Sequence, residues 1–295
     1  LSAGVKIARG IAAAQGRLRA LDPGLVAGFG GYPSLPALWA ARAQKRPILI
    51  HEQNAVLGRV NRSFAKDAAA IACGFARLDL LPPGMEGRKH VTGNPVRGPI
   101  LAAREAGFPP LPAGAPMRLL IIGGSQGARL FGQVIPEALA LLPADLRARL
   151  EVTQQVRPAQ LDTVRAAYHA ADLTPELAPQ KTDLGPRLAA CHFVIARAGA
   201  SSVTELMVAG RGAVLVPLKI AADDHQTANA AALAAVGAAD IIEEDLFVPA
   251  VLAPLLRDRL GDGHSLAVRA AAARAAGQPD SAQRLADLAE QTAAR

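Results

Sequence analysis

The sequence predicts an α/β protein built on parallel sheets with helices on both faces. Short apolar runs alternate with amphipathic segments along most of the chain, which is the rhythm of repeated strand–helix–strand units. A glycine-rich turn leads from an expected strand into an expected helix at Gly28, Gly123 and Gly199. The composition, 51% hydrophobic but only 3% aromatic, favours closely packed helices on sheets. In such sheets ligands bind where the strands end, so these turns are the first candidates for a site.

The first part of the chain, residues 1–97, is expected to form one lobe. Residues 2–20 place Val5, Ile7 and Ile11 among basic side chains at helical spacing, which predicts an amphipathic helix. Three apolar runs predict strands, and the segments between them predict helices. The strands are expected over 24–28, 47–50 and 70–73, and the helices over 36–45 and from just after residue 54 to about residue 69.

Residues 98–116 are expected to link this lobe to a second one, because 107–116 are dense in proline and glycine. The second lobe is expected over 117–264, and the Ala- and Arg-rich residues 265–295 predict a C-terminal helical segment. Two domains of about 150 residues each agree with the length of the chain. In the second lobe, strands are expected over 118–122, 150–153, 192–196 and 213–217, and helices over 129–142 and 158–170 and from residues 200 and 225 onward.

The formal net charge of +7 is concentrated in residues 1–100, which hold 14 basic and 5 acidic side chains against 18 and 20 in the remainder. A basic half suggests an anionic partner such as a membrane surface, phosphate groups or nucleic acid, although arginine can also act only as a solubiliser. The chain has few aromatic residues and no known nucleic-acid-binding motif of basic residues, which argues against nucleic acid as the partner. The two distant cysteines match no metal spacing, and no apolar run reaches the ~18 residues of a membrane span.

The strongest functional signal lies between Arg197 and Gly237. The turn at Gly199 opens a helix whose first backbone N–H groups can seat a diphosphate, and Glu205 one turn further can accept two vicinal hydroxyls. The polar loop Asp223–Gln226 follows the next strand and can reach a sugar. Together these features indicate a nucleotide-sugar site. Taken singly, Glu205 could be a solvated helix acid and the loop an N-cap cluster.

Three further polar turns follow expected strands, and each has a structural alternative. Ser125, in the turn Gly123–Gly127, can donate to a phosphate or cap a helix, and Gly124 allows close backbone approach. Tyr32 can stack on a substrate, unless its turn is only a tight connection. The run His51–Asn54 either meets a ligand or caps the next helix, and without a second ligand pair it does not predict a metal site. Arg97 can clamp a diphosphate or form a hinge salt bridge.

The motifs GFGGYPS, HEQNAVLGRVNR, GNPVR, GGSQGAR and ASSVTE…DDHQTANA, spread over residues 25–242, resemble those of the bacterial undecaprenyldiphospho-muramoylpentapeptide β-N-acetylglucosaminyltransferases. The resemblance implies two Rossmann-like lobes facing a cleft, the glycosyltransferase B fold, with the N-terminal lobe incomplete. It implies transfer of N-acetylglucosamine from UDP-N-acetylglucosamine to a lipid-linked acceptor, lipid I, which gives lipid II with inversion. The implied location is the cytoplasmic face of the inner membrane, at an anionic surface. No metal or cofactor and no nucleic acid is implied.

The same resemblance implies which residues bind the donor. Glu205 matches the acid that holds the ribose hydroxyls, Gln226 matches the amide that reads the sugar hydroxyls, and Ser125 and Arg97 match nucleotide or diphosphate contacts. His225 stands where some relatives carry a second glutamine, and Gly124 and Tyr32 are further candidates. The implied set is Asn54, Arg97, Ser125, Ala200, Ser201, Ser202, Val203, Thr204, Glu205 and Gln226.

One departure concerns catalysis. Members of the family begin with a Gly-Gly-x-Gly-Gly-His loop that supplies a candidate general base, and none of the six histidines here stands in that context. We therefore expect donor binding with slow or no transfer, and no catalytic base can be named. Two alternatives remain open: another UDP-sugar transferase or epimerase of the same fold, and a non-catalytic binding fragment.

Overall fold

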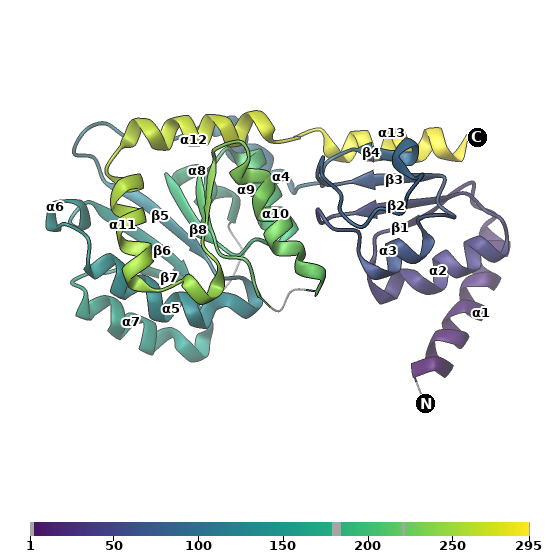
Figure 1. The fold of residues 1–295 in the computed structure, drawn as a ribbon, viewed down its shortest axis with the longest axis horizontal. Coiled ribbons are helices and arrows are strands. Elements are labelled where there is room, and N and C mark those ends of the chain that lie inside the picture. Colours follow the sequence, from purple (N-terminus) through teal and green to yellow (C-terminus); the bar gives the residue numbers. More distant parts are fainter. Residues whose placement is uncertain (1–2, 179–183, 220–221, 295) are drawn as a thin grey trace. The chain divides into compact units, whose positions relative to one another are not determined.

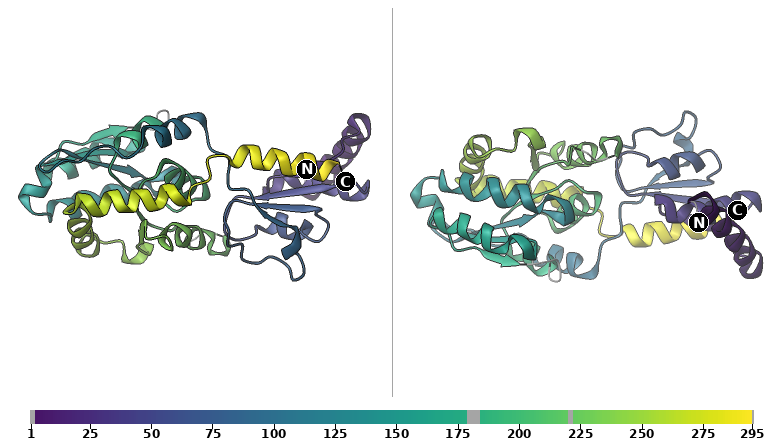
Figure 2. Two further views of the ribbon diagram at one scale, coloured as in Figure 1. Left: turned by 90° about the horizontal axis from the view of Figure 1, so that it is seen from above. Right: turned by 90° about the horizontal axis from the view of Figure 1, so that it is seen from below.

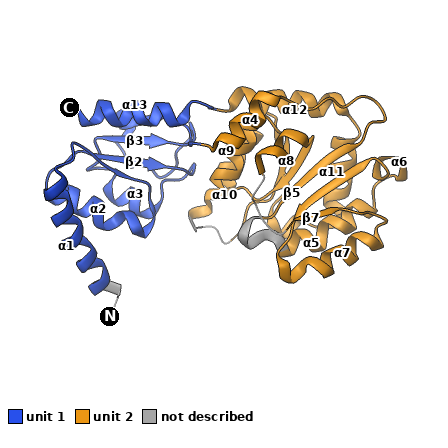
Figure 3. Cartoon of the chain, turned by 180° about the vertical axis from the view of Figure 1, so that it is seen from behind, with its two compact units in different colours: residues 1–95, 278–295 blue, residues 96–277 orange. Residues whose placement is uncertain are grey.

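The computed structural model describes residues 3–178, 184–219 and 222–294; within that part, the side chains of residues 3, 4, 124–128 and 222 are not described. The chain divides into two compact units, which Figure 3 shows in blue and orange. Unit 1 comprises residues 1–95 and 278–295, and unit 2 comprises residues 96–277. Among the described residues, no helix is both long enough and apolar enough to cross a bilayer.

Unit 1 is a four-stranded parallel sheet with helices on both faces (Figure 1). Its strands follow one another across the sheet in chain order: β1 (Val26–Gly28), β2 (Ile48–Glu52), β3 (Ala70–Cys73) and β4 (Lys89–Val91). One face is covered by α2 (Gly31–Ala43) and α3 (Arg59–Phe64), and α1 (Ala3–Leu21) packs on α2. Helix α13 (Ser281–Ala293) covers the other face, where Leu285 and Leu288 join Leu49 and Ala72 in a small core.

Unit 2 is a six-stranded parallel sheet in the order β10-β9-β8-β5-β6-β7. Helices α5, α7 and α11 pack on one face of the sheet, and α4, α8, α9 and α12 pack on the other. Figure 2 shows the unit from these two sides, from above on the left and from below on the right. The strands are β5 (Met117–Ile122), β6 (Leu150–Gln155), β7 (Glu176–Ala178), β8 (Phe193–Ala196), β9 (Ala213–Leu215) and β10 (Ala239–Ile241). The helices are α4 (Gly98–Ala106), α5 (Gly124–Ala140), α6 (Ala144–Arg147), α7 (Leu161–Ala170), α8 (Leu184–Ala190), α9 (Ala200–Ala209), α10 (His225–Ala234), α11 (Pro249–Leu260) and α12 (Gly263–Ala276).

The strand order of unit 2 fixes where a ligand can bind. The chain builds outward from β5 through β6 to β7, then returns to the other side of β5 and builds outward again through β8, β9 and β10. The direction of winding therefore reverses between β5 and β8. At such a switch point the loops after the two central strands diverge to opposite faces and leave a crevice at the carboxyl edge. The turns at Gly123 and Gly199 both lie at this edge.

The parallel α/β architecture and the expected strands are confirmed, but the boundaries of the parts differ from the expectation. The expected linker over 98–116 begins with α4, which packs against α8 and α9 and belongs to unit 2. Pro99 stands in the first turn of α4, where its missing N–H group costs no helical hydrogen bond. The expected helical segment over 265–295 is divided, because α12 belongs to unit 2 and α13 to unit 1.

One buried guanidinium joins three helix ends in unit 2. Arg211, only 1% exposed, donates to the carbonyl oxygens of Gly107 at 2.6 Å, after α4, and of Leu188 at 2.6 Å, in α8. It also donates to Ala209 at 2.8 Å and Gly210 at 2.7 Å, which end α9. The last carbonyls of a helix lack partners and carry partial negative charge. Arg211 therefore stabilises the ends of α4, α8 and α9 at once and fixes their relative positions.

Replacing Arg211 by methionine should destabilise unit 2, because the substitution leaves several buried carbonyls without a donor. Each unsatisfied buried group costs about 1–3 kcal/mol, so we expect the free energy of unfolding to fall by about 3 kcal/mol or more. Urea unfolding followed by circular dichroism measures the change. Arg257→Met, at an exposed position, is the control. Equal stability of the two variants would contradict the structural role of Arg211.

Candidate functional site

The N-terminus of α9 presents backbone N–H groups that have no acceptor within the helix, at the carboxyl edge of the sheet. Gly199 precedes the helix in an extended conformation (φ −63°, ψ 148°), and no side chain caps the helix. The first helical hydrogen bond runs from the N–H of Val203 to the carbonyl of Gly199. The N–H groups of Ala200, Ser201 and Ser202 precede that bond and point out of the helix end, as an anion requires.

The side chains of the expected stretch 200–205 divide into two groups. Val203 is fully buried and Thr204 is 7% exposed, so both side chains belong to the packed face of α9. Ser201 is exposed and Ser202 half-buried, at the open end of the helix. The structure thus leaves Ser201, Ser202 and Glu205 as the members of this stretch whose side chains can face a ligand.

Glu205 and Arg97, which the sequence analysis assigns separately to the donor, lie together. A guanidinium nitrogen of Arg97 stands 3.2 Å from Oε1 of Glu205, and the arginine side chain is 62% exposed while the glutamate is 14% exposed. Arg97 is the residue before α4, and Glu205 lies in the second turn of α9, so the packing of α4 on α9 brings them into contact. The other carboxylate oxygen makes no hydrogen bond to a described residue, so it can accept one.

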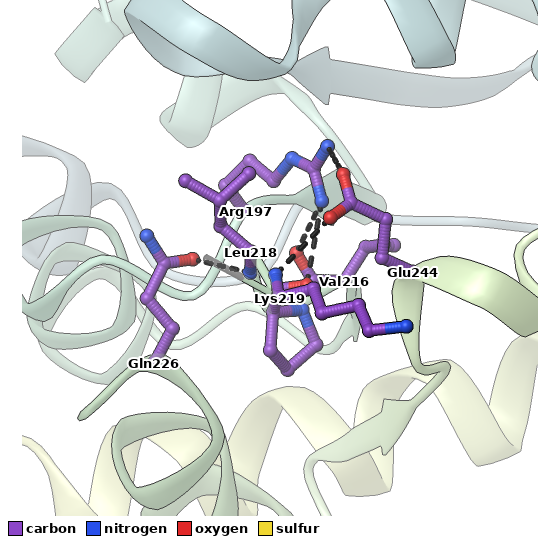
Figure 4. Close-up of polar contacts among 7 residues, drawn as sticks. Arg197, Val216, Leu218, Lys219, Gln226 and Glu244 are labelled. Carbon is purple, nitrogen blue, oxygen red and sulfur yellow. Dashed lines mark hydrogen bonds and ion pairs between the residues drawn. The ribbon is translucent and has the colours of Figure 1, made fainter. Parts of the chain in front are cut away.

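The loop after β9 is held by side chains from both sides (Figure 4). Arg197, which follows β8 and is 8% exposed, donates to the carbonyls of Val216 at 3.2 Å and Pro217 at 3.4 Å. The same guanidinium pairs with Oε1 of Glu244 at 2.5 Å, and its carbon lies 5.2 Å from the centre of the Phe131 ring. Oε2 of Glu244 accepts from the backbone N–H of Lys219 at 3.1 Å. Neither Arg197 nor Glu244 was expected to have a role, although an arginine directly after a buried strand is a signal of such a contact.

Gln226 points toward this loop from α10. Its Oε1 accepts the N–H of Leu218 at 3.0 Å, and in Figure 4 its amide nitrogen points away from that contact. His225 is the first residue of α10, after Asp223 and Asp224 in left-handed backbone conformations (φ 52° and 50°). The buried Asn229 donates to the carbonyl of Ala198 at 3.2 Å and thereby ties α10 to the turn before α9.

In unit 1, the run His51–Asn54 was expected either to meet a ligand or to cap the next helix. Its contacts are mainly structural. Glu52 is 2% exposed, and its Oε2 accepts from the N–H of Gly58 at 2.9 Å and the amide of Asn61 at 2.8 Å. Its Oε1 accepts from the backbone N–H and the side-chain amide of Asn54 at 3.0 and 3.2 Å. Burial lowers the pKa of His51, whose Nε2 lies 3.2 Å from the carbonyl oxygen of Gly93. This network closes the turn after β2.

The remaining expected site residues are placed as follows. Tyr32 lies in α2 and is 76% exposed, so its ring is open to a ligand in unit 1. Gly124 is the first residue of α5, at the carboxyl end of β5. The side chain of Ser125 lies outside the described part of the structure. Of the expected donor residues, those at α4, α9 and α10 therefore lie together in unit 2. Asn54 and Tyr32 belong to unit 1.

Comparison with known proteins agrees with this architecture. The model of the glycosyltransferase family 28 C-terminal domain matches residues 118–285, and that of the N-terminal domain of the same family matches residues 1–73. A UDP-N-acetylglucosamine--N-acetylmuramyl-(pentapeptide) pyrophosphoryl-undecaprenol N-acetylglucosamine transferase of Maricaulis maris is 47% identical over 96% of this chain and 77% of its own length. The transferase of the same name from Methylobacterium sp. is 49% identical over 97% of this chain and 77% of its own length.

Solved structures give the same result. The crystal structure of Acinetobacter baumannii MurG superposes with a TM-score of 0.82 at 35% identity, over 99% of this chain and 81% of that one. The UDP-GlcNAc 2-epimerase of Neisseria meningitidis, bound to UDP-GlcNAc, superposes with a TM-score of 0.62 at 14% identity, over 99% of this chain and 82% of its own; this likeness concerns the fold alone. The chain belongs to glycosyltransferase family 28 and, within it, to the N-acetylglucosamine transferases named above.

Proposed function

We propose that this chain transfers N-acetylglucosamine from UDP-N-acetylglucosamine to undecaprenyl-pyrophosphoryl-N-acetylmuramoyl-pentapeptide, converting lipid I to lipid II in peptidoglycan synthesis. The observation that carries the proposal is the identity of 46–49% to transferases of that name over most of the chain. The site in unit 2 supports it, because α9 and α10 of that unit carry a helix N-terminus, a carboxylate and an amide, which are groups suited to bind a diphosphate, a ribose and a sugar. Through this product the enzyme would serve cell division and cell shape.

Each part of the donor has a partner of matching chemistry. The N–H groups at the start of α9 would hold the diphosphate, and the unengaged oxygen of Glu205 would accept from a ribose hydroxyl. Arg97 would neutralise charge beside them, and the amide nitrogen of Gln226 would donate to the sugar. Asn54, which lies in unit 1, is the further donor contact that the resemblance implies.

The reaction we propose is a single displacement with inversion. The 4-hydroxyl of the acceptor attacks the anomeric carbon, the bond to the diphosphate breaks, and UDP leaves with the electron pair. The proton of the hydroxyl is released to solvent. Negative charge then grows on the departing diphosphate, and fixed N–H donors at α9 stabilise that charge without reorganising. This chain's part in catalysis is therefore leaving-group stabilisation. The test is transfer of labelled N-acetylglucosamine by this chain to a soluble lipid I analogue, with UDP-glucose as the control donor. Transfer no faster than in the absence of the protein would refute the proposal.

Glu205→Ala should weaken UDP binding, because the carboxylate that accepts the ribose hydroxyls is lost. A hydrogen bond to a charged group contributes about 1.5–3 kcal/mol, so we expect the dissociation constant of UDP to rise by about 10- to 150-fold. Isothermal titration calorimetry measures the change. The matched control is Glu137→Ala, an exposed acid in the C-terminal half of α5. Unchanged UDP affinity in the Glu205 variant would exclude a ribose contact.

We also propose that unit 1 places the enzyme on the anionic cytoplasmic face of the inner membrane. Trp39 is 42% exposed, and Arg42 lies 4.4 Å from its ring centre, whereas the neighbouring Leu38 is fully buried in the core. Val5 and Ile7 are exposed on α1 beside Lys6 and Arg9. Exposed apolar side chains among cations suit a lipid surface, where each basic residue contributes about 1 kcal/mol.

Binding of the protein to vesicles of anionic lipid should be strong at low salt and weak near 0.5 M salt, because screening then acts over only a few ångströms (about 4 Å). Co-sedimentation at a series of salt concentrations measures this dependence, with neutral vesicles as the control. Binding that does not change with salt, or none even at low salt, would show that the charge of unit 1 has another purpose.

A further inference from the structure

The loop after β9 has an unusual feature: four consecutive residues are fixed by side chains from three other elements. The carbonyls of Val216 and Pro217 accept from Arg197, the N–H of Leu218 donates to Gln226, and the N–H of Lys219 donates to Glu244. Glu244 lies in the short 3₁₀ turn Glu244–Leu246 after β10, about 25 residues along the chain from the loop it holds. Figure 4 shows these contacts gathered around the loop.

The hydrogen bond from Leu218 determines which end of the Gln226 amide is exposed to a ligand. A side-chain amide carries an acceptor oxygen and a donor nitrogen, and its hydrogen-bond partners decide their assignment. Because the N–H of Leu218 requires an acceptor, Oε1 of Gln226 must face the loop at 3.0 Å. The NH₂ group then points the other way, so Gln226 offers a ligand donors only. A hydroxyl oxygen of the sugar can accept from it, as can the carbonyl oxygen of the N-acetyl group.

Glu244 is placed to hold this orientation. Both of its carboxylate oxygens accept from donors, Oε1 from Arg197 and Oε2 from the N–H of Lys219. The carboxylate therefore ties the loop to the guanidinium that also holds the carbonyls of Val216 and Pro217. Loss of the charge would leave the arginine buried without its anion, at 9% side-chain exposure, which is costly in a protein interior.

We propose that Glu244 is a positioning residue for sugar recognition: through Arg197 and the loop 216–219 it orients the amide of Gln226 as a donor to a hydroxyl of the donor sugar. The inference rests on the proposed function, since it concerns the sugar end of the same ligand. It separates the site into two parts. Glu205 and α9 bind the nucleotide and depend little on Glu244, whereas Gln226 binds the sugar and depends on it.

The experiment compares two ligands in the variant Glu244→Gln. An amide has one oxygen, so it can accept from Arg197 or from Lys219 but presents its own donor to the other. We expect affinity for UDP-N-acetylglucosamine to fall about fivefold, as loss of one hydrogen bond predicts, while affinity for UDP changes by less than about twofold. Glu243→Gln removes the same charge at the preceding exposed position and is the matched control. Calorimetry with both ligands on all three proteins gives the ratios.

A double-mutant cycle tests whether Glu244 acts through Gln226. Gln226→Glu keeps an acceptor for the N–H of Leu218 but removes the donor, so it should lower sugar-dependent affinity by itself. In the Gln226→Glu background, Glu244→Gln should cause little further loss of affinity for UDP-N-acetylglucosamine, because the effects of substitutions at coupled residues are not additive. If Glu244→Gln fails to fold, Glu244→Asp replaces it, since the shorter side chain keeps the charge but cannot reach both partners.

Two outcomes would overturn the inference: an unchanged ratio of the two affinities, which includes an equal loss for both ligands, or full additivity in the cycle. Failure of the proposed function would look different. In that case the wild-type protein itself would bind UDP-N-acetylglucosamine no better than UDP-glucose.

Discussion

The ion pair between Arg197 and Glu244 is the interaction on which the carboxyl edge of unit 2 depends. It joins the end of β8, the loop after β9 and the turn after β10, three neighbouring strands of one sheet. Parallel strands deliver their loops to the same edge but do not fix the conformations of those loops. A buried ion pair that also binds the loop does so, because any movement of the loop would leave the carbonyls of Val216 and Pro217 and the N–H of Lys219 without these partners.

Helix α9 has a second buried arginine beyond its other end. Arg197 stands three residues before its first residue, and Arg211 lies two residues after its last. The first holds the strand ends around the helix N-terminus, and the second gathers the C-termini of α4, α8 and α9. Arg97 begins α4, so the register of α4 against α9 also determines the contact between Arg97 and Glu205. Helix packing thus sets the end of the proposed site that would bind the nucleotide, and the loop after β9 sets the end that would bind the sugar.

The sequence predicts the parts of this molecule that are encoded locally. The four apolar residues Leu119–Ile122 predict β5, and Gly199 with Glu205 predicts a helix N-terminus that suits a nucleotide. Edge strands are harder, because β4 (Lys89–Val91) and β7 (Glu176–Ala178) are short and mix polar with apolar residues. Helix α4 was not predicted, because the proline-rich residues that follow it led us to expect a linker over the whole of 98–116. No local pattern shows that Ser281 returns to unit 1, where it donates to the carbonyl of Asn94 at 2.8 Å. Likewise, a polar loop predicts that Gln226 is available but not which end of its amide faces the ligand.

Hydrogen–deuterium exchange with and without UDP-N-acetylglucosamine tests most directly whether the carboxyl edge of the unit 2 sheet is the donor site. The N–H groups of Ala200, Ser201 and Ser202 have no helical partner, so they should exchange fast in the empty protein and slow down once a diphosphate accepts from them. We predict ligand-dependent protection in peptides covering 198–206 and 223–230, and none in those covering 144–170. Protection confined to other segments, or no protection over 198–206 at saturating ligand, would contradict this account.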